Sequence, residues 1–267
     1  MKFLKFTLKC LYSLLPRSLR TRIYFQRLVF QGLPIIAKPT FAEDGLISQH
    51  LVEFLDDPKF VRAYAKGKAT GALDNHPGDI RFRAYIACWA ATQAMTLDGD
   101  FVECGVGQGL LSKTIVEYLD FSKVSKHFFL FDTYAGIPLE KVKHSELENV
   151  QFLNKIHFTR PYLEKVSVLF SDFPNVKLVQ GILPESIDKQ DIGAISYLSI
   201  DMNNAESEIE TVRILWERII KGGVILIDDY AYGPEYLEQK RAWDVFALSK
   251  KISILTLPTG QGLIIKQ

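Results

Sequence analysis

Acidic side chains stand at the ends of four predicted strands, and these are the residues whose type and spacing could do chemistry. Glu103 lies just before the end of the first strand, Asp132 closes the second, and Asp201 and Asp228-Asp229 close two later ones. The carboxyl ends of parallel strands meet at one edge of a sheet, where open α/β sheets bind ligands. Carboxylates gathered there need compensation by a metal ion or by cationic and hydroxyl-rich groups of a ligand.

A glycine-rich turn with the sequence ECGVGQG follows the first of these strands and contains Gly105, Gly107 and Gly109. Glycines here let the backbone approach a ligand closely, although tight turns also use glycine for steric reasons alone. The dinucleotide fingerprint GxGxxG would need a glycine where Leu110 stands. The observed spacing suits a ligand without a pyrophosphate. Glu103 can then meet an amino-acid ammonium group of the ligand, and Asp132 can accept both hydroxyls of a ribose.

Strands and helices alternate from about residue 99, and this alternation must position the acids. Strands are predicted at 100–104, 128–131, 176–179, 195–200, 224–227, 252–257 and 263–265, and helices at 110–119, 205–220 and 235–249. Lys221-Gly-Gly223 is predicted to end the second helix as a C-cap. The early strands are continuous apolar runs, as in strands buried on both faces of a parallel sheet. The pattern therefore predicts a doubly wound α/β fold.

The segments FVECGVGQG, FFLFDTYAGIP, LSID and GGVILIDDY together resemble the class I S-adenosylmethionine-dependent methyltransferases. Within that class the chain resembles the macrocin O-methyltransferase family of metal-dependent enzymes, which methylate sugar hydroxyls in bacterial natural products. The resemblance covers about residues 79–267. It implies a Rossmann-like sheet of seven strands, mostly parallel, whose last strand is antiparallel.

The resemblance also implies roles for individual residues. The methionine end of the cofactor would be lined by Glu103 and the three glycines, and Asp132 would hold the ribose. The remaining cofactor-binding residues would be Thr133, Tyr134, Gln180 and Gly181. The metal-binding acids of the family match Asp201, Asp228 and Asp229, with Mg²⁺ as the expected ion, and hard oxygen ligands at two adjacent strand ends agree with that ion. The alternative for Asp228-Asp229 is N-capping of a following helix.

Asn203 is a departure from the family pattern, in which a second aspartate after the fourth strand is the catalytic base. We assign Asp201 and Asn203 as the catalytic positions, yet an asparagine takes no proton at neutral pH. Either a metal-lowered hydroxyl pKa suffices, another residue substitutes, or the substrate differs. The histidines His76, His144 and His157 are expected to be ordinary surface residues, because no spacing pairs them with the acids.

Composition bounds the class of protein. The chain has 267 residues, of which 48% are hydrophobic and 24% charged, which excludes a disordered or low-complexity chain. Three cysteines without a CxxC pair make a disulfide framework or a structural zinc site improbable and fit a reducing, cytoplasmic compartment. No run of 18 apolar residues occurs, so no membrane-spanning helix is predicted. We divide the chain into a helical N-terminal extension (1–78) and a methyltransferase domain (79–267).

The first 42 residues form a basic arm with eight Lys and Arg residues and no acid. The rest of the chain holds 24 basic and 31 acidic residues, a distribution unlike that of a nucleic-acid binder. Residues 1–15 and 18–30 read as amphipathic helices, and residues 1–98 as mostly helical. The arm either lies on an anionic membrane surface through residues 1–28, at the inner face, or packs on its own domain or on the mate in a homodimer.

The sequence thus predicts an S-adenosylmethionine-dependent O-methyltransferase with Mg²⁺ that acts on a hydroxyl of a sugar, glycan or related small molecule. A catechol-like phenol is the nearest variant of the acceptor. One alternative is a catalytically degenerate scaffold that still binds the cofactor, which Asn203 supports. The other is a nicotinamide-dependent oxidoreductase, against which Leu110 argues.

Overall fold

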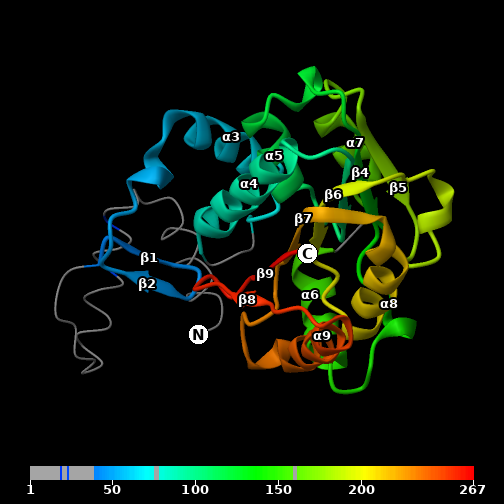
Figure 1. The fold of residues 1–267 in the computed structure, drawn as a ribbon. Coiled ribbons are helices and arrows are strands. Elements are labelled where there is room, and N and C mark those ends of the chain that lie inside the picture. The colour runs from blue at the N-terminus through cyan, green and yellow to red at the C-terminus, as the bar shows by residue number, and fades with distance from the viewer. Residues whose placement is uncertain (1–18, 20–22, 24–38, 75–77, 159–160) are drawn as a thin grey trace.

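The computed structural model describes residues 19, 23, 39–74, 78–158 and 161–267. Most of the basic arm and residues 75–77, which include His76, lie outside the described residues, and so do the two helices predicted within 1–30 except for residues 19 and 23. The described chain forms a helix–sheet–helix sandwich with a small hairpin beside it (Figure 1). No helix in the described ranges is both long and apolar enough to cross a membrane.

A seven-stranded sheet forms the centre of the fold. Its order is β5-β4-β3-β6-β7-β9-β8. The five strands from β3 to β7 are parallel, whereas β9 is antiparallel to both of its neighbours. The bounds are β3 (Asp100–Cys104), β4 (Phe128–Asp132), β5 (Val176–Gln180), β6 (Ile195–Ile200), β7 (Ile219–Ile227), β8 (Leu255–Thr256) and β9 (Gly262–Ile265). The predicted doubly wound, mostly parallel sheet is confirmed.

The register of the parallel strands brings the predicted acids to one edge. Cys104 at the end of β3 is paired with Phe131 of β4 and with Ile200 of β6, and Ile200 is paired in turn with Ile227 of β7. The residues that follow these positions therefore leave the sheet together. The strand order reverses between β3 and β6, which makes their carboxyl ends the switch point where such sheets bind ligands.

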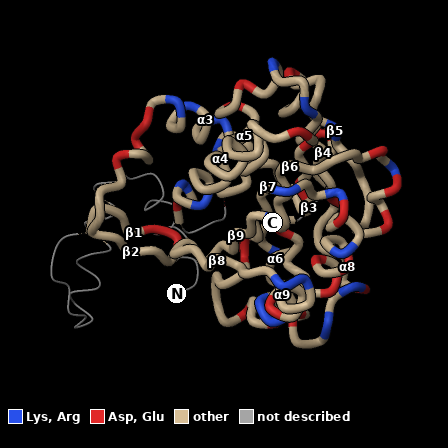
Figure 2. Tube along the Cα trace, viewed as in Figure 1, with Lys and Arg blue, Asp and Glu red and all other residues tan. Residues whose placement is uncertain are grey.

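Helices cover both faces of the sheet. The bounds are α3 (Pro58–Lys68), α4 (Arg81–Met95), α5 (Leu110–Tyr118), α6 (Leu147–His157), α7 (Leu163–Leu169), α8 (Ala205–Leu215) and α9 (Leu237–Lys250). One apolar core joins α3, α4 and α5 to Phe101, and the other joins α8 and α9 to Val102. Neighbouring residues of β3 thus pack into the cores on opposite faces of the sheet, which explains the unbroken apolar runs. The charged side chains of α8 are mostly acidic, whereas α9 carries both acidic and basic side chains (Figure 2).

Two predicted boundaries were wrong. The helix after β6 ends at Leu215 and not at residue 220, because a 3-10 turn (Trp216–Arg218) follows and β7 already begins at Ile219. The glycines predicted as a C-cap lie inside β7. The Gly222 amide donates to the Lys266 carbonyl at 2.7 Å, so pairing with the C-terminal strand overrides the local helical pattern.

The expectation that residues 1–98 are mostly helical was also wrong in part. Two short strands, β1 (Phe41–Glu43) and β2 (Leu46–Ser48), form an antiparallel hairpin. Asp44 and Gly45 connect them with φ of 51° and 76°, and an Asp-Gly pair with positive φ is the preferred two-residue hairpin turn. That dipeptide was the signal in the sequence.

Candidate active site

The glycine turn after β3 is shaped by the strand beside it. Gly105 has a φ of 85°, and a Cβ there would collide with the backbone carbonyl of Asp201 at the end of β6. The Asp201 amide also donates to the Cys104 carbonyl at 2.8 Å. Only glycine fits where two strand ends approach this closely. Gly107 is different, because a Cβ there would meet nothing closer than Phe158 at 3.8 Å.

Asp132 joins the glycine turn to the next loop. Its Oδ2 accepts hydrogen bonds from the amides of Val106 and Gly107, each at 2.8 Å. Its Oδ1 accepts from the Tyr134 amide at 2.6 Å and from the Tyr162 hydroxyl at 2.9 Å. Burial raises the pKa of this carboxyl, and these four donors lower it. The carboxylate predicted to meet a ribose is therefore also the residue that holds the turn in place.

A cavity of about 610 Å³ opens beside this turn, at the ends of β3 to β6. Its lining includes Gly105, Gly107, Asp132, Thr133 and Gly181, all of which were predicted to bind the cofactor. The aromatic rings on its wall were not predicted. They come from Phe158 and Tyr162, which are stacked 5.6 Å apart between ring centroids.

A second cavity of about 580 Å³ shares Gly107, Phe158 and Asp201 with the first. Glu103 lines it and is buried, and its Oε2 has no hydrogen-bond partner within the described residues. Burial raises the pKa of this carboxyl to about 8. An unpartnered buried carboxylate oxygen is energetically unfavourable unless a ligand donates to it.

Three carboxylates gather where β6 and β7 end. Asp201, Asp228 and Asp229 each offer an oxygen within 4.8 Å of the others. The two after β7 are buried, and Asp201 also lines both cavities. The next helical turn begins at Pro234, after Gly233, so neither Asp228 nor Asp229 caps it.

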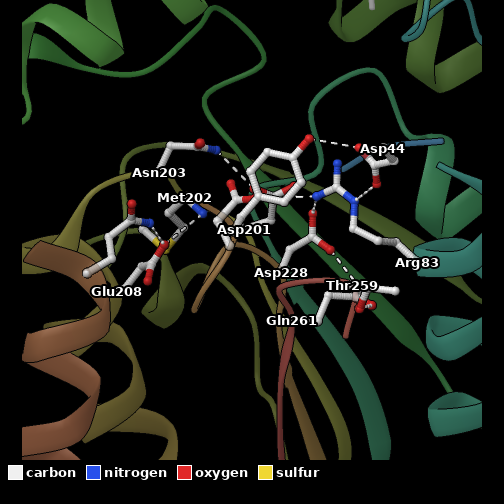
Figure 3. A network of polar contacts seen from close by, with 12 residues as sticks. Asp44, Arg83, Asp201, Met202, Asn203, Glu208, Asp228, Thr259 and Gln261 are labelled. Atoms are coloured by element: carbon white, nitrogen blue, oxygen red, sulfur yellow. Dashed lines mark hydrogen bonds and ion pairs between the residues drawn. The ribbon is translucent and has the colours of Figure 1, made fainter. Parts of the chain in front are cut away.

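Arg83, from α4, is the cation beside this group (Figure 3). Its Nη1 lies 2.7 Å from Asp228 Oδ2 and 3.3 Å from Asp229 Oδ1, and its Nε lies 2.9 Å from Asp44 Oδ2 in the hairpin turn. The Tyr232 ring covers the guanidinium, with 4.7 Å from Cζ to the ring centroid, and the Tyr232 hydroxyl donates to Asp44 Oδ1.

Two further contacts fix the aspartates from outside. Gln261 of the β8–β9 turn is fully buried, and its Nε2 donates to Asp228 Oδ1 at 2.8 Å. Asn203, with a φ of 55°, donates from Nδ2 to Asp201 Oδ1 at 2.9 Å. The side chain at the expected base position thus orients Asp201, and as an amide it cannot accept the proton of an acceptor hydroxyl.

Glu208 of α8 anchors the loop that carries Asp201 and Asn203. Its carboxylate accepts from the Met202 amide at 3.3 Å and from the side chains of Gln239 and Trp243, each at 2.8 Å. Burial raises the pKa of Glu208 to about 6. The loop therefore depends on α8 and α9 for its position.

The acidic group carries more negative charge than Arg83 balances. Burial, followed by the charges of the neighbouring aspartates, raises the pKa of both Asp201 and Asp229 well above the ordinary range. Three aspartates, Asp44, Asp228 and Asp229, pair with the one guanidinium of Arg83, and Asp201 belongs to the same acidic group. Hard oxygen donors with excess negative charge at this spacing fit a magnesium ion, which is the ion predicted from the sequence.

The predicted cofactor residues do not all reach the cavities. The Tyr134 side chain is fully buried and donates its hydroxyl to the Leu130 carbonyl, and Tyr162 supplies the ring on the cavity wall. Gly109 and Gln180 lie next to the site without lining either cavity. His157 lines the second cavity, and His144 is exposed.

Arg83, Asp44, Tyr162 and Gln261 were missed because each comes from an element remote in sequence. Arg83 stands 145 residues before Asp228. No spacing rule reaches so far, and the local signal was only an arginine near the start of a mostly apolar helix.

This architecture, with a glycine turn at the switch point of a sheet that carries one reversed strand, is that of the class I methyltransferases. Within that class, the family model of macrocin-O-methyltransferase (TylF) matches residues 71–255, and the chain belongs to this family. It is an S-adenosylmethionine-dependent O-methyltransferase, which argues against the nicotinamide-dependent alternative.

Solved structures agree on the fold. The O-methyltransferase NovP is 20% identical with a TM-score of 0.59, over 69% of this chain and 79% of that chain. The calicheamicin methyltransferase CalS11 is 16% identical with a TM-score of 0.56, over 69% and 78%. A search of curated protein sequences gave no significant match.

Proposed function

We propose that this enzyme transfers the methyl group of S-adenosylmethionine to a hydroxyl of a sugar or glycan, with Mg²⁺ held by Asp201, Asp228 and Asp229. The observation that carries the proposal is the position of Asp201, which belongs to the acidic group and lines both cavities of the glycine turn. A cofactor in the cavities and an acceptor oxygen at the aspartates would therefore be neighbours.

The two cavities suit the two ends of the cofactor. The first cavity has Asp132, Thr133 and the Phe158 and Tyr162 rings for the adenosine. The second has the Glu103 carboxylate, whose Oε2 has no partner among the described residues, for the ammonium group of the methionine end. In this assignment the ribose hydroxyls compete with Tyr162 for Asp132 Oδ1, because that oxygen already accepts two strong hydrogen bonds.

The acidic group supplies the other half of the chemistry. A bound divalent ion would lower the pKa of an acceptor hydroxyl and orient it. The chain's own contribution is alignment: Gln261 and Asn203 fix the carboxylates, and Glu208 fixes the loop. Methyl transfer needs an aligned attack more than covalent help, so fixed geometry provides much of the rate.

Asn203 favours a second candidate, a family member that binds the cofactor without turning over. Without a carboxylate base at that position, the hydroxyl proton must pass to another residue or to solvent, and a bound metal ion would favour this by lowering the pKa of the hydroxyl. Calorimetric titration with S-adenosylmethionine and a methyl-transfer assay against a glycan set with labelled cofactor separate the two. Binding with transfer supports the enzyme, binding without any transfer supports the scaffold, and absence of binding contradicts both.

The arm supports a proposal of its own, namely reversible contact with an anionic membrane through residues 1–28. Its support is the sequence alone: eight cationic side chains without an acid over residues 1–42, beside Phe and Leu. Packing in a homodimer is the competing role. Contact with a membrane would suit a lipid-linked glycan as the acceptor.

A further inference from the structure

Arg83 already sits where a cation of the acidic group belongs. Its Nη1 bridges Asp228 Oδ2 and Asp229 Oδ1, and its side chain is almost fully buried. Figure 3 shows the guanidinium pointing from α4 into the space between the hairpin turn and the end of β7. A buried cation that contacts two of three metal-binding carboxylates cannot be neutral toward the metal, since like charges at this distance repel strongly.

The guanidinium is held by groups outside the metal-binding set. Asp44 accepts a hydrogen bond from Nε at 2.9 Å. The Tyr232 ring covers the face of the guanidinium, and the Tyr232 hydroxyl donates to Asp44. Asp44 in turn sits in the tight turn between β1 and β2. Arg83 is therefore also held by contacts that do not use Nη1.

The carboxylate oxygens that would bind a metal ion already accept hydrogen bonds. Asp228 has both oxygens engaged, Oδ2 by Arg83 and Oδ1 by Gln261. Asp201 has Oδ1 engaged by Asn203, and Asp229 has Oδ1 engaged by Arg83. A divalent ion that used all three aspartates would approach an Asp228 oxygen that already accepts a hydrogen bond, and the guanidinium is the donor that its charge repels.

We propose that Arg83 is an internal competitor of the divalent ion, whose guanidinium occupies Asp228 and Asp229 until the ion displaces it onto Asp44. The inference rests on the metal site of the proposed function. It assigns Arg83 two effects: it keeps the carboxylates together when no ion is bound, and it weakens the binding of the ion. Loading the site thus requires breaking the Nη1 contacts.

The test is the affinity of the full-length protein for Mn²⁺, measured by electron paramagnetic resonance of the free ion. Arg83→Gln removes the charge and should bind Mn²⁺ more tightly by on the order of tenfold or more. Arg81→Gln is the matched control, because Arg81 lies on the same helix and pairs with a buried aspartate, Asp79, away from the site. It should bind Mn²⁺ as the wild type does. Unchanged or weaker binding by Arg83→Gln would overturn the proposal.

A second measurement follows the wild-type protein itself and uses a variant only to assign the resonance. In wild-type protein with ¹⁵N-labelled arginine, Mg²⁺ should move the Nε–H resonance of Arg83, assigned with Arg83→Lys, and leave that of Arg81 in place. A stationary Arg83 resonance at saturating Mg²⁺ contradicts displacement. If neither the wild type nor the variants bind a divalent ion while S-adenosylhomocysteine still binds, the assignment of the metal site is wrong. The proposed competition by Arg83 is then wrong as well. If the wild type binds the ion and Arg83→Gln gains nothing, only the competition is wrong.

Discussion

The proposed cofactor side and the proposed metal side of this site are built differently. On the cofactor side, Asp132 holds the glycine turn through backbone amides of consecutive βα units. On the metal side, Asp228 is held by Arg83 of α4 and Gln261 of the β8–β9 turn. The first region is organised by local backbone geometry, and the second by side chains from both ends of the chain. The second should therefore be the easier of the two to perturb with single side-chain changes that leave the fold intact.

The largest effect is expected at Gly105. Gly105→Val would drive its side chain into the Asp201 carbonyl and also strain a backbone with positive φ, a strain that alone costs about 1–3 kcal/mol. We expect a markedly lower melting temperature and cofactor affinity reduced more than about tenfold. Gly107→Ala is the control, because its Cβ has space and only the strain remains. Equal melting temperatures for both variants would contradict the close approach.

Loss of a metal-binding carboxylate should remove catalysis with the fold intact. Asp201→Asn also removes one of several like charges, so its melting temperature should not fall at neutral pH. Methyl transfer should fall by at least about 100-fold, roughly 2.7 kcal/mol in the barrier. Excess chelator should do the same to the wild type, reversibly with Mg²⁺ or Mn²⁺. Full activity in excess chelator would show that methyl transfer does not depend on a metal ion.

Glu103 offers a test through pH. Its folded pKa of about 8 lies above the ordinary value of 4.5, so between these values the folded state binds more protons than the unfolded state. Stability from this group is therefore lost as pH rises through that window. Glu103→Gln should be more stable than the wild type above pH 8, converge with it at low pH, and bind the cofactor more weakly. The exposed Glu164→Gln should follow the wild type, and a constant difference at all pH values would refute the assignment.

Asn203→Asp asks whether a base is missing. The new carboxylate would lie beside Asp201, where Nδ2 now donates. If deprotonation limits the rate, turnover should rise or the pH optimum should move downward. An unchanged pH–rate profile would show that the proton leaves by another route.

The smallest effect on chemistry is expected from the arm. Deletion of residues 1–28 should leave cofactor binding and melting temperature unchanged and abolish sedimentation with anionic vesicles at low salt. Each basic residue near such a surface contributes about 1 kcal/mol, and salt screens this contribution. A changed oligomeric state or a lower melting temperature would instead support packing of the arm in a dimer.

The same contrast explains what could be predicted. The existence of the strands, their mostly parallel arrangement and the acids at their ends follow from apolar runs and from spacing, which are local. The hairpin at Asp44 was signalled by its Asp-Gly turn, and the early start of β7 was hidden by the helical pattern before it. Arg83 and Gln261 reach Asp228 only through tertiary packing, and no local pattern encodes that. Asp132 was predicted as a site residue from its place at a strand end, but its backbone partners became visible only in the fold.

The most direct test of the central claim is calorimetric titration of wild-type protein and Asp229→Asn, first with S-adenosylhomocysteine and then with Mn²⁺. Asp229 belongs to the acidic group and lines neither cavity, so it separates the two regions. The account predicts cofactor-product affinities within about threefold of each other and Mn²⁺ affinity at least about tenfold weaker in the variant. No binding of S-adenosylhomocysteine by the wild type, or equal losses of both ligands in the variant, would contradict it.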